Sequence, residues 1–199
     1  MTDLNIGIIV GSTRPGRVGH LVGDWVKANV SAPGVTFELV DLHDYKLPLL
    51  EESFPSPAGS FAGAEANKWA HKVNEFDGYI FVVGEYNHSL PAAIKNALDY
   101  VKFEWANKSA GIVSYGSMGG ARSAEHLRQI FGELQVADVR QQVMFSLFTD
   151  FAGFGTAEVA FTPADNKAGE LETLVDQVVS WGGALRSLRE LQAEEQAAA

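Results

Sequence analysis

The sequence predicts an α/β fold: a three-layer sandwich in which helices cover both faces of a five-stranded parallel sheet. Apolar runs of strand length alternate along the chain with segments of helical periodicity. Three of these runs are almost continuously apolar, which is typical of parallel strands covered on both faces. The chain has 199 residues and is 46% hydrophobic, enough to form one domain. We expect that domain over residues 1–191 and a disordered tail over 192–199.

Five apolar runs predict the strands. The first, third and fourth are the near-continuous runs, whereas the second mixes in polar residues and is expected to be more exposed. Short connections favour the strand order 2-1-3-4-5 of a doubly wound sheet, although periodicity alone does not fix that order. The expected strands are Asn5 to Val10, Val35 to Leu42, Tyr79 to Val83, Ala110 to Tyr115, and Val139 to Leu147.

Five segments have apolar residues at helical spacing, and each predicts a helix that buries one face. Two long irregular stretches, 43–60 and 149–166, interrupt the pattern, and loops of such length usually form a site or an interface. The apolar stripes of the helices are Val18, Leu21, Val22, Trp25 and Val26; Trp69, Val73 and Phe76; Ile94, Ala97, Leu98, Val101 and Trp105; Ala124, Leu127, Phe131 and Leu134; and Leu171, Leu174, Val175, Val178, Leu185 and Leu188.

Composition excludes several function classes. A formal net charge of -10 argues against a nucleic-acid partner, which requires a basic surface. The absence of cysteine excludes disulfides, thiolate metal sites and a cysteine nucleophile, and the five histidines form no metal-ligand spacing with carboxylates, so no metal is expected. The chain shows no secretory signal and no apolar run of the roughly 20 residues that cross a bilayer. We therefore expect a cytoplasmic protein with no membrane partner.

The first expected strand ends in a loop suited to an anion. Residues 11–19 contain glycine, serine and threonine, which let the backbone curl, together with Arg14 and Arg17, and they lead directly into a helix. Gly11 and Gly16 have the spacing of a nucleoside-triphosphate loop, but Arg17 and Val18 stand where lysine and a hydroxyl residue would be required. The loop also lacks the dinucleotide-binding glycine pattern. A bound phosphate therefore fits best, and a plain chain-reversing turn is the alternative.

The third and fourth expected strands also end in polar loops. Residues 84–100 offer an aromatic face at Tyr86, an amide at Asn87 and a hydroxyl at Ser89, just before a helix that begins near Pro91. Residues 114–122 are rich in glycine and serine, which allow the backbone to approach a flat ligand. The plainer readings are a helix-capping turn and a flexible turn, respectively.

Parallel strands end at the same edge of a sheet, so these three loops are expected to converge on one ligand. That ligand should carry a phosphate at one end and a planar polar ring at the other, which describes FMN.

Two motifs resemble those of the NADPH-dependent FMN reductase family of flavodoxin-like proteins, which includes azoreductases, quinone reductases and chromate reductases. They are Gly-Ser-x-Arg at 11–14 and Glu-Tyr-Asn-x-Ser-x-Pro-x-x-x-Lys-Asn-Ala-x-Asp at 85–99. A third match covers 119–122 with Leu127 and Arg128, and the resemblance runs from Asn5 to Phe131. Two positions depart from the family: Gly84 stands where many relatives carry proline, and His88 is at the variable position of the second motif.

The resemblance implies roles for residues of all three loops. Lys95, Asn96 and Asp99 also match the family, and we expect them to fix the loop and helix because Lys95 and Asp99 are an i, i+4 pair. The FMN phosphate would be held by Ser12, Arg14, Arg17, Val18 and Gly19; the flavin would be lined by Glu85, Tyr86, Asn87, His88 and Ser89; and its ring edge would meet Ser114, Tyr115, Gly116, Ser117, Met118 and Gly119.

The resemblance also implies an activity: transfer of hydride from NADPH or NADH through bound FMN to a small-molecule acceptor such as free flavin, a quinone, an azo compound or an oxidised metal. No side chain is expected to be an indispensable acid or base, and His88 is one candidate proton donor. Relatives form dimers or tetramers, so a homodimer or homotetramer is expected. The alternatives are a flavodoxin-like FMN electron carrier without NAD(P)H turnover, which the acidic charge suits, and a flavin-free regulatory or scaffold module.

Overall fold

The computed structural model describes residues 3–52 and 60–198. Its main sheet has five parallel strands in the order β2-β1-β3-β4-β5, so the predicted fold and strand order are confirmed. β1 and β3 pair directly, with Ile8 opposite Ile80, and the strand order reverses at this point. The strands are β1 (Leu4–Val10), β2 (Val35–Asp41), β3 (Gly78–Gly84), β4 (Lys108–Gly116) and β5 (Val136–Ser146).

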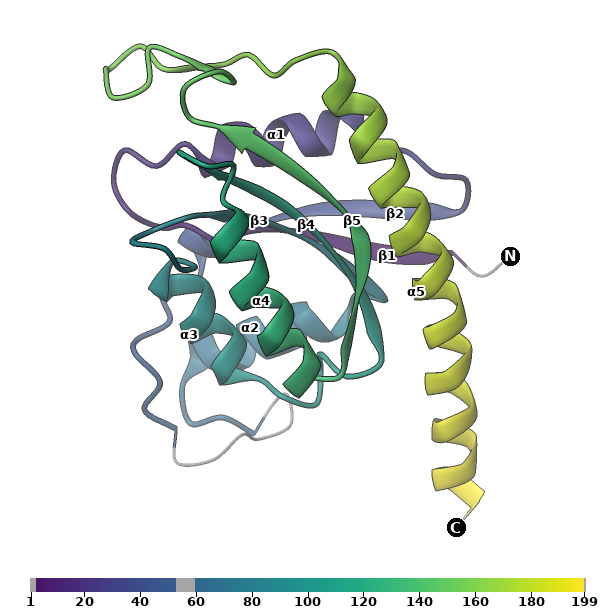
Figure 1. The fold of residues 1–199 in the computed structure, drawn as a ribbon. Helices are drawn as coiled ribbons and strands as arrows, with labels where there is room; N and C mark the ends of the chain where they lie inside the picture. The colour runs from purple at the N-terminus through teal and green to yellow at the C-terminus, as the bar shows by residue number, and fades with distance from the viewer. Residues whose placement is uncertain (1–2, 53–59, 199) are drawn as a thin grey trace.

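Helices cover both faces of the sheet, as Figure 1 shows. One apolar core lies between the sheet and α2, α3 and α4; the other lies between the sheet and α1 and α5. β3 is buried along its whole length because it is central, whereas β2 is partly exposed at the edge, as its mixed sequence predicts. The helices are α1 (Gly19–Asn29), α2 (Ala64–Asn74), α3 (Ala92–Tyr100), α4 (Ala121–Glu133) and α5 (Asn166–Ala198).

Two helices are shorter than their apolar spacing predicts. α2 ends at Asn74 although the stripe includes Phe76, and α3 ends at Tyr100 although the stripe continues through Val101 and Trp105. Val101 has an extended backbone, and Trp105 is buried by tertiary contact, with its ring centroid 4.9 Å from that of Tyr79. These residues have helical spacing in the sequence, but they pack into the core from the segments that follow α2 and α3.

The irregular stretch 149–166 is partly ordered by a two-stranded antiparallel ribbon, β6 (Phe151–Ala152) and β7 (Ala160–Phe161). Phe151 is buried, and Phe161 packs edge-on against Phe145 with ring centroids 4.8 Å apart, so these two aromatics belong to the core. In the other stretch, 43–60, a short 3-10 helix η1 (Leu42–Asp44) begins the segment, and residues 53–59 lie outside the described residues.

The last helix is longer than expected. α5 continues to Ala198, where the sequence analysis expects a disordered tail over 192–199. Alanine, glutamate and glutamine all favour helix, and nothing in this segment interrupts it. Figure 1 shows α5 along one edge of the molecule, with its C-terminal part extending past the sheet. Among the described residues no helix is long and apolar enough to cross a membrane.

Candidate functional site

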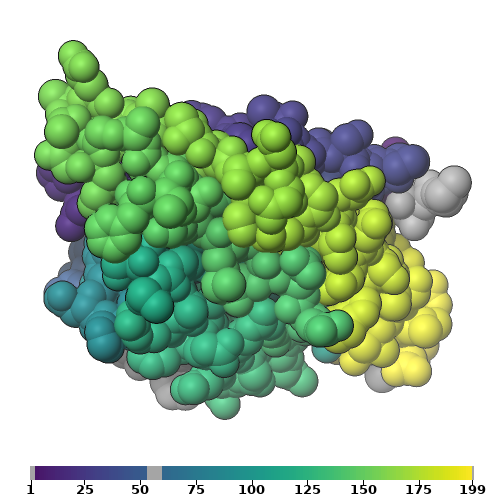
Figure 2. All heavy atoms as spheres, turned by 45° about the horizontal axis from the view of Figure 1, so that its top comes forward, coloured from purple at the N-terminus to yellow at the C-terminus, as the bar shows by residue number. Residues whose placement is uncertain are grey.

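The loops after β1, β3 and β4 meet at the carboxyl edge of the sheet. They enclose a pocket of about 290 Å³ beside the point where the strand order reverses. Figure 2 shows the light-green connection between β5 and α5 protruding from the molecule at this end. Parallel sheets bind ligands at this position because loops from neighbouring strands diverge there. The pocket is lined by Arg14, Gly16, Arg17, Val18, Glu85, Tyr86, Asn87, Tyr115, Gly116, Leu147 and Phe154.

Arg17 provides positive charge at one end of this pocket. Its Nη2 donates to Asp41 Oδ2 at 2.6 Å, at the end of the neighbouring strand β2, whereas its Nη1 is buried without a hydrogen-bond partner. A buried guanidinium N–H without a partner costs free energy that a bound anion would recover. α1 also begins beside it with no side-chain cap at Val18, so the first amides of that helix face the loop uncapped. This end of the pocket fits a phosphate group.

Tyr86 forms an aromatic wall of the pocket. The guanidinium of Arg14 lies 4.9 Å from the centre of the Tyr86 ring, which joins the first loop to the second. Tyr86 and Ser89 exchange backbone hydrogen bonds of 2.8 and 3.1 Å around Asn87 and His88, whose φ angles are 50° and 69°. Two consecutive left-handed residues define a tight hairpin turn. The turn holds Tyr86 at the pocket and leaves Asn87 and His88 exposed.

Glu85 joins the second loop to the third. Its side chain is only 4% exposed, and its carboxylate pairs with the Arg122 guanidinium and accepts from the Arg122 backbone N–H at 3.2 Å. Arg122 lies in the first turn of α4, which lacks a side-chain cap at Gly120, so the carboxylate also compensates the positive end of that helix. Glu85 lines the pocket, but its carboxylate is paired with Arg122 of α4.

Tyr115 forms the floor of the site. Burial raises its pKa to about 12, so the phenol stays neutral, and its hydroxyl lies 3.0 Å from the Ser12 hydroxyl. The ring fits because its neighbours are glycines: a Cβ added to Gly19 or Gly84 would lie 2.5 or 2.9 Å from Tyr115. The glycine at position 84, which departs from the family pattern, therefore matches the tyrosine at position 115 of this chain.

The contact between Gly84 and Tyr115 predicts the effect of replacing Gly84 with proline, the residue that many relatives carry at this position. Gly84→Pro should push the Tyr115 ring out of place and destabilise the fold by about 2 kcal/mol, because overpacking a filled core costs 1 to 3 kcal/mol. In a Tyr115→Ala background the same change should cost much less. Thermal unfolding of the four proteins of this cycle measures the coupling. Equal costs in both backgrounds would contradict the contact.

Eight of the sixteen predicted binding residues line the pocket, and the others lie behind its wall or away from it. Ser12, Gly19 and Ser114 are buried behind its wall, and Ser114 Oγ donates to the Gly119 carbonyl at 2.6 Å. Ser117 and Met118 are exposed at the rim. Sequence reasoning missed Leu147 and Phe154, which line the pocket from the stretch after β5. The length of the irregular stretch 149–166, which contains Phe154, is the one sequence signal for this part of the pocket.

The rest of the second motif fixes the loop and helix, as expected. Lys95 and Asp99 form the predicted i, i+4 pair at 2.5 Å. The Asn96 side chain donates to the Pro48 carbonyl at 2.6 Å and accepts from the Leu50 N–H at 2.9 Å, which ties α3 to the chain after η1. Ser89 points away from the pocket: its hydroxyl lies 2.9 Å from Nδ1 of His126 on α4. Over 3–52 and 60–198 no three potential ligands of the His, Asp and Glu types gather as a metal site.

The family comparison agrees with this geometry. The family model described as NADPH-dependent FMN reductase matches residues 4–150, which include all three loops. The chain belongs to the NADPH-dependent FMN reductase family. It is 33% identical over 145 residues to the NAD(P)H-dependent FMN reductase LOT6 of Saccharomyces cerevisiae, a match that covers 67% of this chain and 76% of the yeast protein. The predicted family, its enzyme class and its cofactors are therefore confirmed at the level of the family.

Two further relatives have different names. The chain is 25% identical over 185 residues to the 2-hydroxy-1,4-benzoquinone reductase of a Burkholderia species, covering 89% of this chain and 96% of that protein. The solved structure of FerB, a flavoenzyme NAD(P)H:(acceptor) oxidoreductase from Paracoccus denitrificans, superposes with a TM-score of 0.70 at 20% identity and covers 89% of this chain and 98% of FerB. The structural likeness confirms the flavodoxin-like fold of this FMN reductase family member.

Proposed function

We propose that this protein is an NAD(P)H-dependent flavoenzyme that binds FMN in the pocket between the three loops and reduces planar aromatic acceptors of the quinone class. The proposal rests on the side chains that line the pocket. The pocket is lined by Arg17, which has a buried guanidinium nitrogen without a partner, and by the aromatic rings of Tyr86 and Tyr115. A phosphate needs the first feature and a flat ring system needs the second.

The residues present fit FMN. Arg17, Arg14 and the uncapped start of α1 would hold the phosphate, and Tyr86 with the backbone at Gly116 would bound the ring. Bound FMN supplies the hydride-transfer chemistry. The protein contributes position and electrostatics: the Glu85–Arg122 pair fixes the loop after β3 against α4, and the Tyr86–Ser89 turn fixes the aromatic wall. No side chain in this set is required to transfer a proton.

The rim of the pocket supports a planar apolar acceptor. Phe154 lines the pocket and is 40% exposed; Met118, two residues after the lining residue Gly116, is 67% exposed, and Phe148, next to the lining residue Leu147, is 76% exposed. Exposed methionine and phenylalanine side chains beside a site bind flat apolar molecules, because both make favourable contacts with aromatic rings. A relative named as a benzoquinone reductase fits this rim.

Anaerobic reduction tests the proposed function. Protein loaded with FMN should lose its visible flavin absorbance when NADPH or NADH is added, and a benzoquinone should restore it. The initial rate with the quinone should exceed the rates with free FMN and with an azo dye. A flavin that stays oxidised in the presence of excess NAD(P)H would support the electron-carrier alternative, and a protein that binds no FMN would support the flavin-free one.

His88 is expected to be dispensable. Its left-handed φ of 69° is unfavourable for a residue with a Cβ, so His88→Gly should leave stability unchanged or raise it by up to about 1 kcal/mol. The rate of flavin reduction by NADPH should change by less than twofold. Stopped-flow absorbance and thermal unfolding measure the two effects. A tenfold slower reduction in a stably folded variant would instead identify His88 as a proton donor.

A further inference from the structure

The two methionines of the described residues lie around one glycine of the loop after β4. The chain has three methionines and no cysteine, and Met1 lies outside the described residues. Met118 directly precedes Gly119 in the chain. Met144, on β5, reaches the same glycine across the sheet: its Sδ lies 3.5 Å from the position that a Cβ would take on Gly119. We refer to Met118 and Met144 as the methionine pair.

The methionine pair borders the pocket between the three loops. Its members lie two residues after Gly116 and three residues before Leu147, and both of these residues line the pocket. Met144 is also opposite Ser114 in the sheet, and Ser114 fixes the loop by donating from Oγ to the Gly119 carbonyl at 2.6 Å. A chemical change at either sulfur therefore acts on the loop at the pocket rim.

Both thioethers are accessible from solvent, because the Met118 side chain is 67% exposed and the Met144 side chain is 43% exposed. In a chain without cysteine, exposed thioethers are the groups that dilute peroxide oxidises first. Oxidation to the sulfoxide turns a flexible apolar side chain into a polar one. The favourable contacts that a thioether makes with an aromatic ring are then lost.

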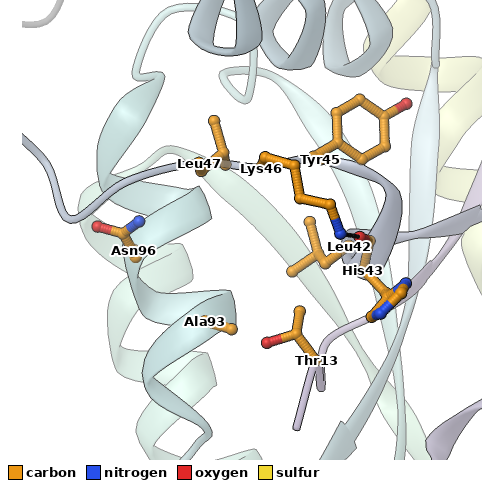
Figure 3. Close-up of a pocket in the computed structure, with 8 residues that line it drawn as sticks. All are labelled: Thr13, Leu42, His43, Tyr45, Lys46, Leu47, Ala93 and Asn96. Atoms are coloured by element: carbon orange, nitrogen blue, oxygen red, sulfur yellow. Dashed lines mark hydrogen bonds between the residues drawn. The ribbon is translucent and has the colours of Figure 1, made fainter. Parts of the chain in front are cut away.

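A neighbouring hollow of about 300 Å³ provides a contrast. It lies at Thr13 of the loop after β1, between the chain from Leu42 to Leu47 and α3 (Figure 3). None of the eight side chains that line this hollow contains sulfur. Oxidation of thioethers therefore alters the rim formed by the loop after β4 and by β5, and it leaves the lining of this hollow unchanged.

We propose that the methionine pair is an oxidation site that sets the affinity of the pocket for its planar acceptor. The oxidant is hydrogen peroxide. The sulfur takes an oxygen atom from it, the O–O bond breaks and water leaves, so the thioether is oxidised to a sulfoxide and the peroxide is reduced. This inference rests on the proposed function, because the acceptor is the one proposed there. The change is reversible, since methionine sulfoxide reductases restore the thioether.

Binding of 1,4-naphthoquinone to the oxidised, FMN-loaded protein, measured by calorimetry, tests the inference without turnover. Dilute hydrogen peroxide should add an oxygen atom to Met118 and to Met144, which mass spectrometry of the digested protein detects. Naphthoquinone binding should then weaken by about tenfold, because each residue loses a sulfur–aromatic contact. Treatment with the two sulfoxide reductases, one for each epimer, should restore the affinity together with the thioethers.

Two variants control for oxidation at other positions. Met118→Leu/Met144→Leu keeps an apolar rim that cannot form a sulfoxide, so its affinity for naphthoquinone should be the same before and after peroxide treatment. Leu191→Met in this background introduces a thioether at a position that is 58% exposed on α5. That position is near Arg189, which pairs with Asp77 at the amino end of β3. Peroxide should oxidise the introduced thioether without changing the affinity.

A methionine pair that stays reduced in dilute peroxide, or complete oxidation that leaves the affinity for naphthoquinone unchanged, would overturn the inference. An affinity that stays low after both thioethers are restored would also overturn it. The two proposals fail separately. A flavin that NADPH reduces, in a protein whose quinone affinity does not respond to oxidation, would keep the proposed function alone. A quinone affinity that falls on oxidation, in a protein whose flavin NADPH does not reduce, would keep the oxidation site alone.

Discussion

Arg17→Leu should weaken FMN binding by about 100-fold. Arg17 combines a buried Nη1 without a partner with an ion pair to Asp41, so it is the donor at the phosphate end that gains most from a bound anion. Loss of a charge-assisted hydrogen bond costs roughly 1.5 to 3 kcal/mol, a factor of about 10 to 100 in affinity. The variant also leaves the Asp41 carboxylate unpaired near the phosphate, which adds repulsion. Quenching of FMN fluorescence on titration measures the dissociation constant.

Two variants control this experiment. Arg17→Lys keeps one positive charge but loses the second donor, so its affinity should fall between those of the wild type and Arg17→Leu. Arg14→Ala should weaken binding by only about tenfold, because Arg14 is exposed and stacks on Tyr86 instead of lying buried. An Arg17→Leu protein that is folded and binds FMN as tightly as the wild type would remove Arg17 from the phosphate site.

The stability of the protein should rise with pH above neutrality because of Lys108. This lysine is buried at the start of β4, where its Nζ donates to the Val73 carbonyl at the end of α2 and to the Tyr79 hydroxyl, both at 3.1 Å. Burial, together with the nearby positive charge of Arg189, lowers the pKa of Lys108 from 10.5 to about 7. The folded protein therefore contains a neutral amine over a pH range in which the unfolded chain is protonated.

Between about pH 7 and pH 10.5 the unfolded state binds more protons at this position than the folded state, so the free energy of unfolding increases with pH. Below about pH 7 both states are protonated and the full cost of burying the charge is present. The gain from pH 7 to pH 9 should be about 2 kcal/mol. Lys108→Met keeps the length of the side chain and removes this ionisation.

Urea unfolding of both proteins at pH 7 and pH 9 isolates the contribution, since all other ionisations are common to the two. The wild type should gain about 2 kcal/mol relative to Lys108→Met over this range. Parallel changes in the two proteins would show that Lys108 is protonated in the folded state as it is in the unfolded chain.

The sequence alone predicts the sheet because hydrophobic patterning decides which segments are buried on both faces. The prediction from sequence is wrong where a residue is buried by partners that are distant in the chain and not by the pattern of its own segment. Trp105 continues the spacing of α3 but lies in a turn and packs against Tyr79. Lys108 is absent from the predicted strand because a charged residue ends an apolar run, yet β4 begins there, with the amine bonded to the end of α2. The burial of Trp105 and the start of β4 at Lys108 both depend on partners that are distant in the chain.

The candidate site, like the fold, can be predicted only in part from the sequence. Residue types at the strand ends predict the pocket and its three loops, since parallel topology brings these ends together. Side-chain direction is not predictable from position: Ser89 turns toward His126, and Ser12 turns inward to Tyr115. Sequence spacing also gives no sign that Asp41 pairs with Arg17, because this contact exists only once β2 lies beside β1.

A comparison of FMN with riboflavin tests the central claim most directly, because the two ligands differ only in the phosphate. We expect FMN to bind the wild-type protein at least 100-fold more tightly than riboflavin, and we expect this ratio to fall toward one in Arg17→Leu. Equal affinities for FMN and riboflavin in the wild type, or no binding of either, would contradict a flavin site built on the phosphate loop at residues 11–19.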